Sequence, residues 1–131
     1  MTQARDLIQS LYDAFARGDV EHVLGSMAPD IQWYEAEGIP MAAGNPYDSP
    51  QRVGEGVFGY LVGIFDEYGA VPESMVAEGD QVVVFGRYQG VHRENGERLD
   101  APFVHHWVVR NGQVTRFQQY TDTAQMTHLY G

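Results

Sequence analysis

The second half of the chain alternates β-rich runs with short turn pairs, and this pattern constrains the fold more than any other feature. The runs, rich in valine and aromatic residues, predict four strands: 71–78, 81–91, 101–110 and 113–120. Asn111-Gly112 separates the last two runs, and an Asn-Gly pair between such runs is a strong hairpin signal. Gly79-Asp80 and Asn95-Gly96 occupy the other two turns. Strands joined by tight turns are antiparallel, so we expect a meander.

The first half of the chain has the apolar spacing of helices. Ile8, Leu11, Tyr12 and Phe15 recur every three or four residues and predict a helix over 2–17. Apolar spacing and capping residues predict the remaining elements: a short helix over 20–27, a strand over 31–35, a long loop over 36–49, a helix over 50–68 and a terminal helix over 121–130. Helices and strands are therefore segregated along the chain, which predicts an α+β fold in which helices cover one face of a curved sheet. A length of 131 residues predicts one domain, 1–131.

Composition excludes several chemistries. The chain has no cysteine, and all eight basic residues are arginine, so thiol nucleophiles, cysteine metal sites and lysine Schiff bases are excluded. Acidic residues outnumber basic ones by 18 to 8, and the net charge of −10 argues against binding nucleic acid or anionic membranes. No apolar stretch reaches the length of a membrane span, and no signal-peptide pattern follows Met1, so we expect a cytoplasmic protein.

Metal and phosphate sites are not predicted either. His105 and His106 are adjacent on a predicted strand and point to opposite faces, so they do not chelate one ion together. Gly54, Gly56 and Gly59 have the spacing of a dinucleotide motif but lie inside a predicted helix. We therefore expect no metal and no cofactor.

Several segments together resemble a known family. The stretch 104–114, Val-His-His-Trp-Val-Val-Arg-Asn-Gly-Gln-Val, and the stretch 117–124, Phe-Gln-Gln-Tyr-Thr-Asp-Thr-Ala, are the most specific. Segment 17–20, Trp33, the loop 38–44 and segment 57–58 extend the similarity over nearly the whole chain. The sequence resembles the SnoaL-like branch of the nuclear transport factor 2-like superfamily, close to ketosteroid isomerase-related proteins. The resemblance implies a cone-shaped barrel of a strongly curved, mostly antiparallel sheet wrapped around N-terminal helices, with an internal apolar cavity, and usually a homodimer.

The resemblance also implies site residues. In SnoaL-like cyclases a histidine matching His105 handles the polyketide, and an acid/base aspartate falls at the position of Gln119. In the ketosteroid isomerases the carboxylate that abstracts a proton next to a carbonyl matches Glu35. Their oxyanion tyrosine lands on Leu11, one residue before Tyr12, and their second oxyanion donor falls near His105 or His106.

These positions predict a catalytic group of Glu35, His105 and Gln119. A carboxylate in an apolar pocket acts as a base near neutral pH, a neutral histidine donates a hydrogen bond to an enolate, and an amide orients a carbonyl or a water. His105 and Gln119 are expected side by side across the last hairpin. We expect the substrate-binding residues to be aromatic: Tyr12, Trp33, Tyr60, Phe85, Phe103, Trp107 and Phe117.

Simpler interpretations stay open for each of these residues. Glu35 at a strand end is also compatible with a solvated carboxylate, and His105 with a hydrogen-bonded core histidine. Asp122 and Gln125 fit a capping box for the last helix better than an acid in the site.

Two functional classes follow. The first is a cofactor-free proton-transfer enzyme, isomerase- or cyclase-like, acting on a small hydrophobic carbonyl compound. The alternative is a non-catalytic domain that binds a small hydrophobic molecule or serves as an interaction module. The outward face of the last strands, with Val104, His106, Val108, Gln118 and Tyr120, predicts a symmetric homodimer.

Overall fold

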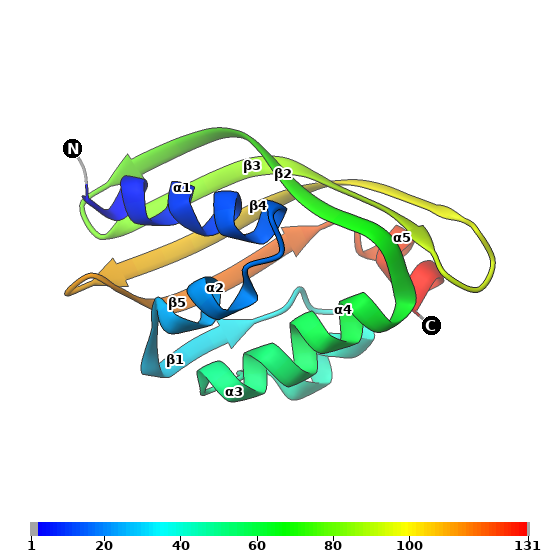
Figure 1. Cartoon of the computed structure of the whole chain (residues 1–131), viewed down its shortest axis with the longest axis horizontal. Coiled ribbons are helices and arrows are strands. Elements are labelled where there is room, and N and C mark those ends of the chain that lie inside the picture. The colour runs from blue at the N-terminus through cyan, green and yellow to red at the C-terminus, as the bar shows by residue number, and fades with distance from the viewer. Residues whose placement is uncertain (1–2, 131) are drawn as a thin grey trace.

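The computed structural model of the protein describes residues 3–130 (Figure 1). The chain forms, in order, α1 (Gln3–Ala16), α2 (Val20–Gly25), β1 (Met27–Tyr34), the 3-10 helix η1 (Pro40–Gly44), α3 (Pro50–Val53), the π-helix η2 (Gly54–Phe58), α4 (Gly59–Ile64), β2 (Phe65–Glu78), β3 (Gln81–His92), β4 (Arg98–Arg110), β5 (Gln113–Thr121) and α5 (Thr123–Tyr130). The segregation of helices and strands confirms the predicted α+β class. The predicted start of the first helix at Thr2 lies outside the described residues.

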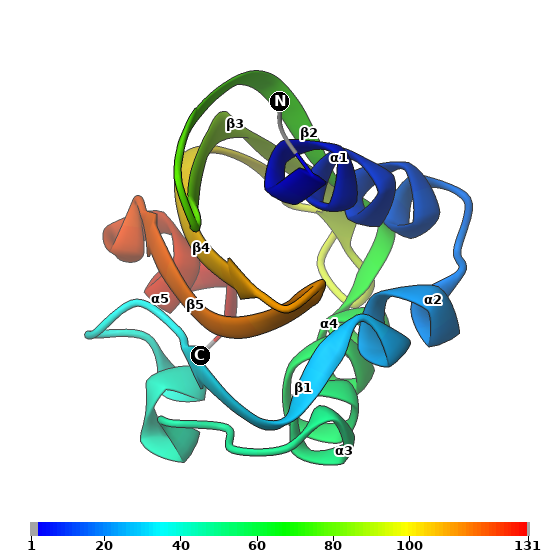
Figure 2. The same ribbon diagram turned by 90° about the vertical axis from the view of Figure 1, so that its left-hand side faces the viewer.

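One five-stranded sheet organises the molecule, in the order β1-β5-β4-β3-β2. The meander β2 to β5 is antiparallel throughout, whereas β1 pairs with β5 in parallel. Figure 2 shows the sheet curling into an open arc, with α1, α2 and the α3–α4 segment across its open side. The sheet is thus a cone that helices complete, as the resemblance implied, and its concave face is the one that side chains and helices fill.

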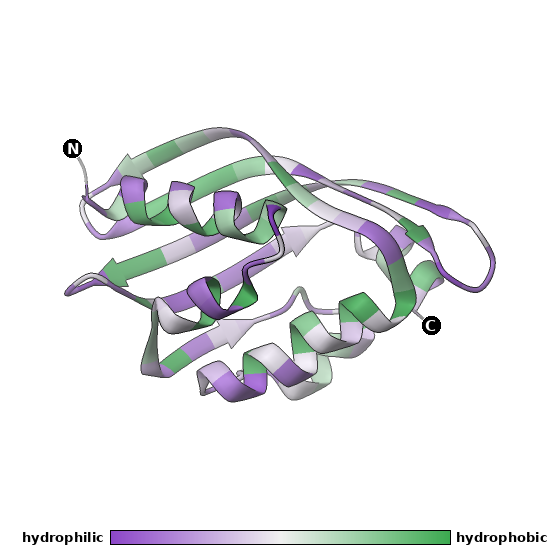
Figure 3. Ribbon diagram, in the orientation of Figure 1, coloured by the Kyte–Doolittle hydropathy of each residue, from purple (hydrophilic) through white to green (hydrophobic). Residues whose placement is uncertain are grey.

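Alternation along the strands decides which side chains enter the cone. Along β3 and β4, buried and exposed residues alternate almost without a break, and Figure 3 shows apolar and polar bands alternating along the same strands. In register across the sheet, Trp33, Phe117, Trp107 and Val82 form one row of inward side chains. Val84, His105 and Gln119 form the next. The concave face therefore presents aromatic rings beside two polar groups.

The prediction of one helix over 50–68 is wrong at its end. The helical segment stops at Ile64, and Phe65 begins β2, which runs six residues ahead of the predicted strand. The cause is strand pairing: Phe65 lies opposite His92, and the backbone N–H of Arg93 donates to the Ile64 carbonyl. Pairing with the end of β3 thus draws residues 65–68 into strand β2, although their apolar spacing alone favours a helix.

Glycines in the α3–η2–α4 segment make room for neighbouring side chains. A Cβ atom on Gly56 would lie 2.5 Å from Cε2 of Tyr47, and one on Gly54 would lie 2.9 Å from Cδ1 of Leu24. Glycine weakens a helix, but here it lets side chains from the preceding loop and from α2 pack directly on the helix backbone.

Candidate functional site

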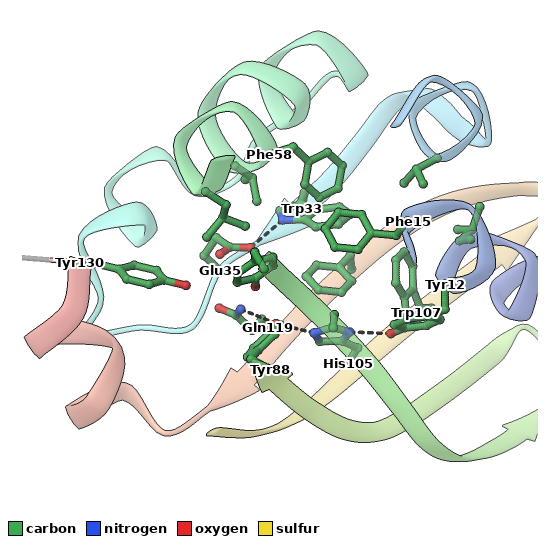
Figure 4. Close-up of a pocket in the computed structure, with 17 residues that line it drawn as sticks. Tyr12, Phe15, Trp33, Glu35, Phe58, Tyr88, His105, Trp107, Gln119 and Tyr130 are labelled. Atoms are coloured by element: carbon green, nitrogen blue, oxygen red, sulfur yellow. Dashed lines mark hydrogen bonds between the residues drawn. The ribbon is translucent and has the colours of Figure 1, made fainter. Parts of the chain in front are cut away.

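A pocket opens between the concave face of the sheet and the helices (Figure 4). The volume of the pocket that the centre of a water molecule can occupy is about 60 Å³. The pocket therefore has room for a small molecule only. The lining is mostly apolar and aromatic: Leu11, Tyr12, Phe15, Val23, Trp33, Glu35, Val57, Phe58, Leu61, Tyr68, Ala70, Tyr88, His105, Trp107, Phe117, Gln119 and Tyr130. Among residues 3–130, Glu35 is the only carboxylate that lines the pocket, and no arginine of this range contributes to the lining.

Glu35 stands just past the end of β1, and a residue from the following loop fixes its direction. The Asn45 side chain accepts from the Glu35 backbone N–H and donates to the Glu35 carbonyl, each at 2.8 Å. The Trp33 indole N–H donates to Oε2 of the Glu35 carboxylate at 2.8 Å. Glu35 is only 2% exposed, so the interpretation of a solvated carboxylate is wrong.

Burial gives this carboxyl an unusual acidity. Loss of hydration raises the pKa of Glu35 from 4.5 to about 7, and the Trp33 hydrogen bond lowers it only in part. None of the ion pairs formed by residues 3–130 involves this carboxylate. The group therefore exchanges a proton near neutral pH, as a general base must.

His105 lies between two tyrosines. Its Nδ1 meets the Tyr12 hydroxyl and its Nε2 meets the Tyr88 hydroxyl, each at 2.5 Å. The Phe103 ring stacks on the imidazole with 3.9 Å between centroids. Burial lowers the pKa of His105 from 6.5 to about 3, so the ring is neutral at physiological pH.

Two obligatory donors close this chain of hydrogen bonds at its ends. The Trp107 indole N–H donates to the Tyr12 oxygen at 3.0 Å, and the Gln119 amide nitrogen donates to the Tyr88 oxygen at 2.7 Å. The Gln119 amide has a fixed orientation, because its oxygen accepts from the backbone N–H of Ala36 at 3.0 Å. The order along the network is therefore Trp107, Tyr12, His105, Tyr88, Gln119.

The tyrosines of the pocket keep their protons. Burial is the largest cause that raises the pKa values of Tyr12, Tyr68, Tyr88 and Tyr130 above the ordinary value. The negative charge of Glu35 adds to this effect at Tyr68, Tyr88 and Tyr130. These three hydroxyls are thus neutral hydrogen-bonding groups close enough to Glu35 to respond to its charge.

The structure brings together most of the residues predicted for the site. The pocket lining includes the three predicted catalytic residues Glu35, His105 and Gln119, and of the predicted binding residues Tyr12, Trp33, Trp107 and Phe117. His105 and Gln119 are directly opposed across the β4–β5 hairpin, which confirms the expected adjacency. Their chemical roles stay predictions.

Three predicted binding residues lie outside the lining. Phe103 is buried behind His105, against which it stacks. Tyr60 is half-buried, and its hydroxyl donates to the Tyr130 carbonyl at 2.9 Å. Phe85 is 41% exposed on the convex face, because strand alternation turns Val84 inward and Phe85 outward.

Three tyrosines of the lining, Tyr68, Tyr88 and Tyr130, were not among the residues predicted from the sequence. Tyr88 shares the inward face of β3 with Val82 and Val84, so the alternation of 81–91 carried the signal. Tyr68 fell in the part of 50–68 assigned to a helix, and Tyr130 comes from α5 at the far end of the chain. Because these three tyrosines come from β2, β3 and α5, only the folded structure shows that their hydroxyls lie near Glu35.

Two other polar residues have structural roles. His106 lies on the convex face, where its Nε2 meets the Gln81 amide oxygen at 2.7 Å. The Asp122 carboxylate accepts from the Gln125 backbone N–H at 3.1 Å, which confirms the predicted cap of the last helix.

The described residues, 3–130, form neither a metal centre nor a membrane-spanning helix. In this range no three His, Asp or Glu side chains are grouped to hold a metal ion, and no helix is long and apolar enough to cross a membrane.

A family model describes most of the sequence. The model of the SnoaL-like domain matches residues 8–117, which include Glu35, Tyr88 and His105. The chain belongs to the SnoaL-like family. No protein with a curated function matches it.

Solved structures of this SnoaL-like protein's neighbours agree in fold. An NTF2-like protein (nuclear transport factor 2-like) from Burkholderia thailandensis is 29% identical, with a TM-score of 0.91 over 100% of this chain and 99% of that one. An NTF2-like protein of unknown function from Burkholderia pseudomallei is 27% identical, with a TM-score of 0.88 over 99% and 98%. TerC, co-crystallised with polyporic acid, is 26% identical, with a TM-score of 0.86 over 98% of each chain.

Proposed function

We propose that this SnoaL-like protein catalyses proton transfer at a carbon next to the carbonyl of a small neutral organic compound, without a cofactor. The observation that carries the proposal is the Glu35 carboxyl: 2% exposed, free of ion pairs to the described residues, with a pKa of about 7, on the wall of an apolar pocket. Such a group takes up and releases protons near neutral pH without a large driving force in either direction.

The proposed reaction balances with the groups in the pocket. The Glu35 carboxylate takes a proton from the α-carbon, and the electron pair of the broken C–H bond forms a C=C bond while the carbonyl oxygen becomes an enolate oxygen. Protonated Glu35 then returns the proton to the same or another carbon, which gives exchange or isomerisation. If the enolate carbon instead attacks a second carbonyl of the substrate, a ring closes. Hydrogen-bond donors at the developing negative oxygen lower the barrier.

The electrostatics of the pocket favour a neutral substrate. The described part of the chain lines it with a carboxylate, a neutral imidazole, an amide and hydroxyls, but with no arginine to pair with an anion. An anionic ligand would therefore lose its hydration without gaining an opposite charge, and the charge of Glu35 would repel it. TerC, a chain 26% identical, was co-crystallised with the organic compound polyporic acid, which supports a small organic ligand for a protein of this fold.

Hydrogen exchange in D2O tests the proposal without knowledge of the natural substrate. The protein is incubated with a panel of neutral ketones, including acetophenone, 2-cyclohexenone and pentane-2,4-dione, and loss of the α-proton is followed by proton NMR. We expect exchange of at least one ketone above the buffer rate, and a fall of about a hundredfold or more in Glu35→Gln, because the general base is gone.

Glu37→Gln is the matched control. It removes the same charge two residues away, from an exposed side chain outside the pocket lining, and is expected to retain wild-type exchange. Equal exchange in wild type and Glu35→Gln would refute Glu35 as the base.

A binding function without catalysis is the second candidate, and Gln119 is the observation that favours it. The SnoaL-like cyclases place an acid/base aspartate at this position, whereas the Gln119 amide is held by Ala36 and Tyr88 and does not exchange a proton at neutral pH. Saturable binding of the ketones with no exchange above buffer would establish this second function.

We also propose that two copies pair through the convex face of the sheet. Phe85, Val104 and Tyr120 form one row across β3, β4 and β5, and Phe85 and Tyr120 are 41% and 56% exposed. Such a row on a solvated sheet face is typical of an interface. Sedimentation should give twice the chain mass for wild type and the chain mass for Val104→Arg; a monomeric wild type at micromolar concentration would contradict the proposal.

A further inference from the structure

The Tyr12, His105 and Tyr88 side chains together carry one more polar hydrogen than the hydrogen bonds among them require. Two hydroxyls and one neutral imidazole carry three hydrogens, whereas the two contacts Tyr12–His105 and His105–Tyr88 use only two. The outer neighbours do not absorb the third, because the Trp107 indole and the Gln119 amide nitrogen are themselves donors to the two tyrosine oxygens. One tyrosine hydrogen is therefore left over.

The spare hydrogen belongs to a hydroxyl on the pocket wall. Tyr12 and Tyr88 both line the pocket, and among residues 3–130 neither hydroxyl has an acceptor other than His105. A buried donor without an acceptor costs about 1–3 kcal/mol. The network is therefore complete only when an acceptor atom occupies the pocket.

The tautomer of His105 decides which hydroxyl is free. When Nε2 carries the ring hydrogen, it donates to Tyr88, Tyr12 donates to Nδ1, and the Tyr88 hydrogen is free. When Nδ1 carries it, the roles reverse and the Tyr12 hydrogen is free. The two tautomers thus offer a donor from opposite sides of the same ring.

The position of Glu35 distinguishes the two sides. Gln119 bonds both Tyr88 and the backbone N–H of Ala36, the residue after Glu35, so Tyr88 lies on the Glu35 side of the imidazole. Tyr12 lies on the other side of the ring (Figure 4). A free O–H that points its hydrogen into the negative potential of Glu35 is favoured over one farther away. This selects the tautomer with the hydrogen on Nε2 and leaves Tyr88 as the donor.

We propose that Tyr88, held by His105 and Gln119, donates its hydroxyl hydrogen to an acceptor oxygen of the pocket's ligand, on the side of that ligand that faces Glu35. That this oxygen is a carbonyl rests on the proposed function; the spare donor itself does not. The ligand class is then a neutral molecule with a carbonyl oxygen, held by a donor that lies on the same side of the pocket as the base. Tyr88 is a residue to which neither the sequence analysis nor the family resemblance assigned a role.

Nitrogen-15 NMR of the unliganded wild-type protein tests the tautomer directly. With ¹⁵N-labelled histidine, the His105 signals are assigned by their loss in His105→Gln. We expect a neutral ring with hydrogen on Nε2 only, and no titration between pH 5 and 8. Hydrogen on Nδ1, or a ring that titrates in this range, would overturn the proposal.

The carbonyl stretch of bound ¹³C-labelled acetophenone tests the donor. In wild type the band should lie at lower frequency than in Tyr88→Phe, and acetophenone should bind that variant about three- to tenfold more weakly, the loss expected for one neutral hydrogen bond. Tyr60→Phe removes a hydroxyl outside the lining and is the matched control, with the wild-type band. A band that is unchanged in Tyr88→Phe but shifted in Tyr12→Phe would assign the donor to Tyr12 instead.

The two proposals fail separately. Absence of hydrogen exchange would remove the catalytic role of Glu35 and leave the tautomer and the carbonyl shift as expected here. If Tyr88→Phe does not fold, or acetophenone does not bind, the tautomer measured on the wild-type protein decides alone.

Discussion

Replacing Glu35 by glutamine should change how stability depends on pH. In the folded protein the pKa of this carboxyl is raised from 4.5 to about 7, so between these values the folded state holds a proton that the unfolded chain has lost. Stability therefore falls as pH rises through this window, by about 3 kcal/mol in total and at most about 1.4 kcal/mol per pH unit. Glu35→Gln removes this loss and should gain stability relative to wild type as pH rises.

His105 produces the opposite slope. Its pKa is lowered from 6.5 to about 3, so the unfolded chain binds the extra proton in this window and stability is lost as pH falls through it, by about 5 kcal/mol. Between about pH 4.5 and 6.5 the contributions of Glu35 and His105 nearly cancel in the wild-type protein. In Glu35→Gln only the His105 contribution remains, so the free energy of unfolding of this variant should rise with pH over this range.

Urea denaturation at pH 4, 5, 6, 7 and 8, followed by tryptophan fluorescence, measures both effects. The free energy of unfolding of Glu35→Gln minus that of wild type should grow by about 3 kcal/mol between pH 4.5 and 7 and be constant outside this range. For Glu37→Gln, which alters an exposed carboxylate, the difference from wild type should stay nearly constant. A constant difference for Glu35→Gln would contradict the raised pKa, because it would mean that folding does not alter the acidity of Glu35.

Three further variants probe the supports of the site. Trp33→Phe removes the hydrogen bond that lowers the pKa of Glu35, so the midpoint of the pH–rate profile for ketone exchange should move upward; an unchanged midpoint would contradict this. Asn45→Ala removes both hydrogen bonds to the Glu35 backbone and should cost about 1–3 kcal/mol in urea denaturation. Gly86→Ala should cost about 1–3 kcal/mol by the same assay, because its Cβ would lie 2.6 Å from Cζ of Phe103; unfolding at the wild-type midpoint would show that β3 shifts freely.

The last hairpin was the most predictable part of the site. Its Asn-Gly turn pairs Arg110 with Gln113, and alternation along β4 places Phe103, His105 and Trp107 on one face. A bulge beside Val108 and Val109 shifts the register by one residue, so that Gln119 rather than Gln118 lies opposite His105. On β3 the continuous apolar run 82–85 conceals the phase of the alternation, which is why Phe85 was assigned to the wrong face. Tyr88, farther along the same strand, shows the correct phase.

The direction of Glu35 depends on contacts that local sequence does not encode. It lies beyond the last residue of β1, where alternation no longer applies, and Asn45, ten residues later, holds its backbone. The end of the helix before β2 was missed for a similar reason, since pairing of Phe65 with His92 is a contact between residues far apart in the chain. Tertiary contacts decided these elements, whereas periodicity decided the hairpin.

The acidity of the Glu35 carboxyl in the folded protein is the property on which the account depends most. Carbon-13 NMR of glutamate labelled at the side-chain carboxyl, with the Glu35 signal assigned by its loss in Glu35→Gln, measures it directly. We expect a titration with a midpoint at about pH 7. A midpoint near 4.5 would contradict this expectation, because Glu35 would then be an ordinary carboxylate with no tendency to hold a proton near neutral pH.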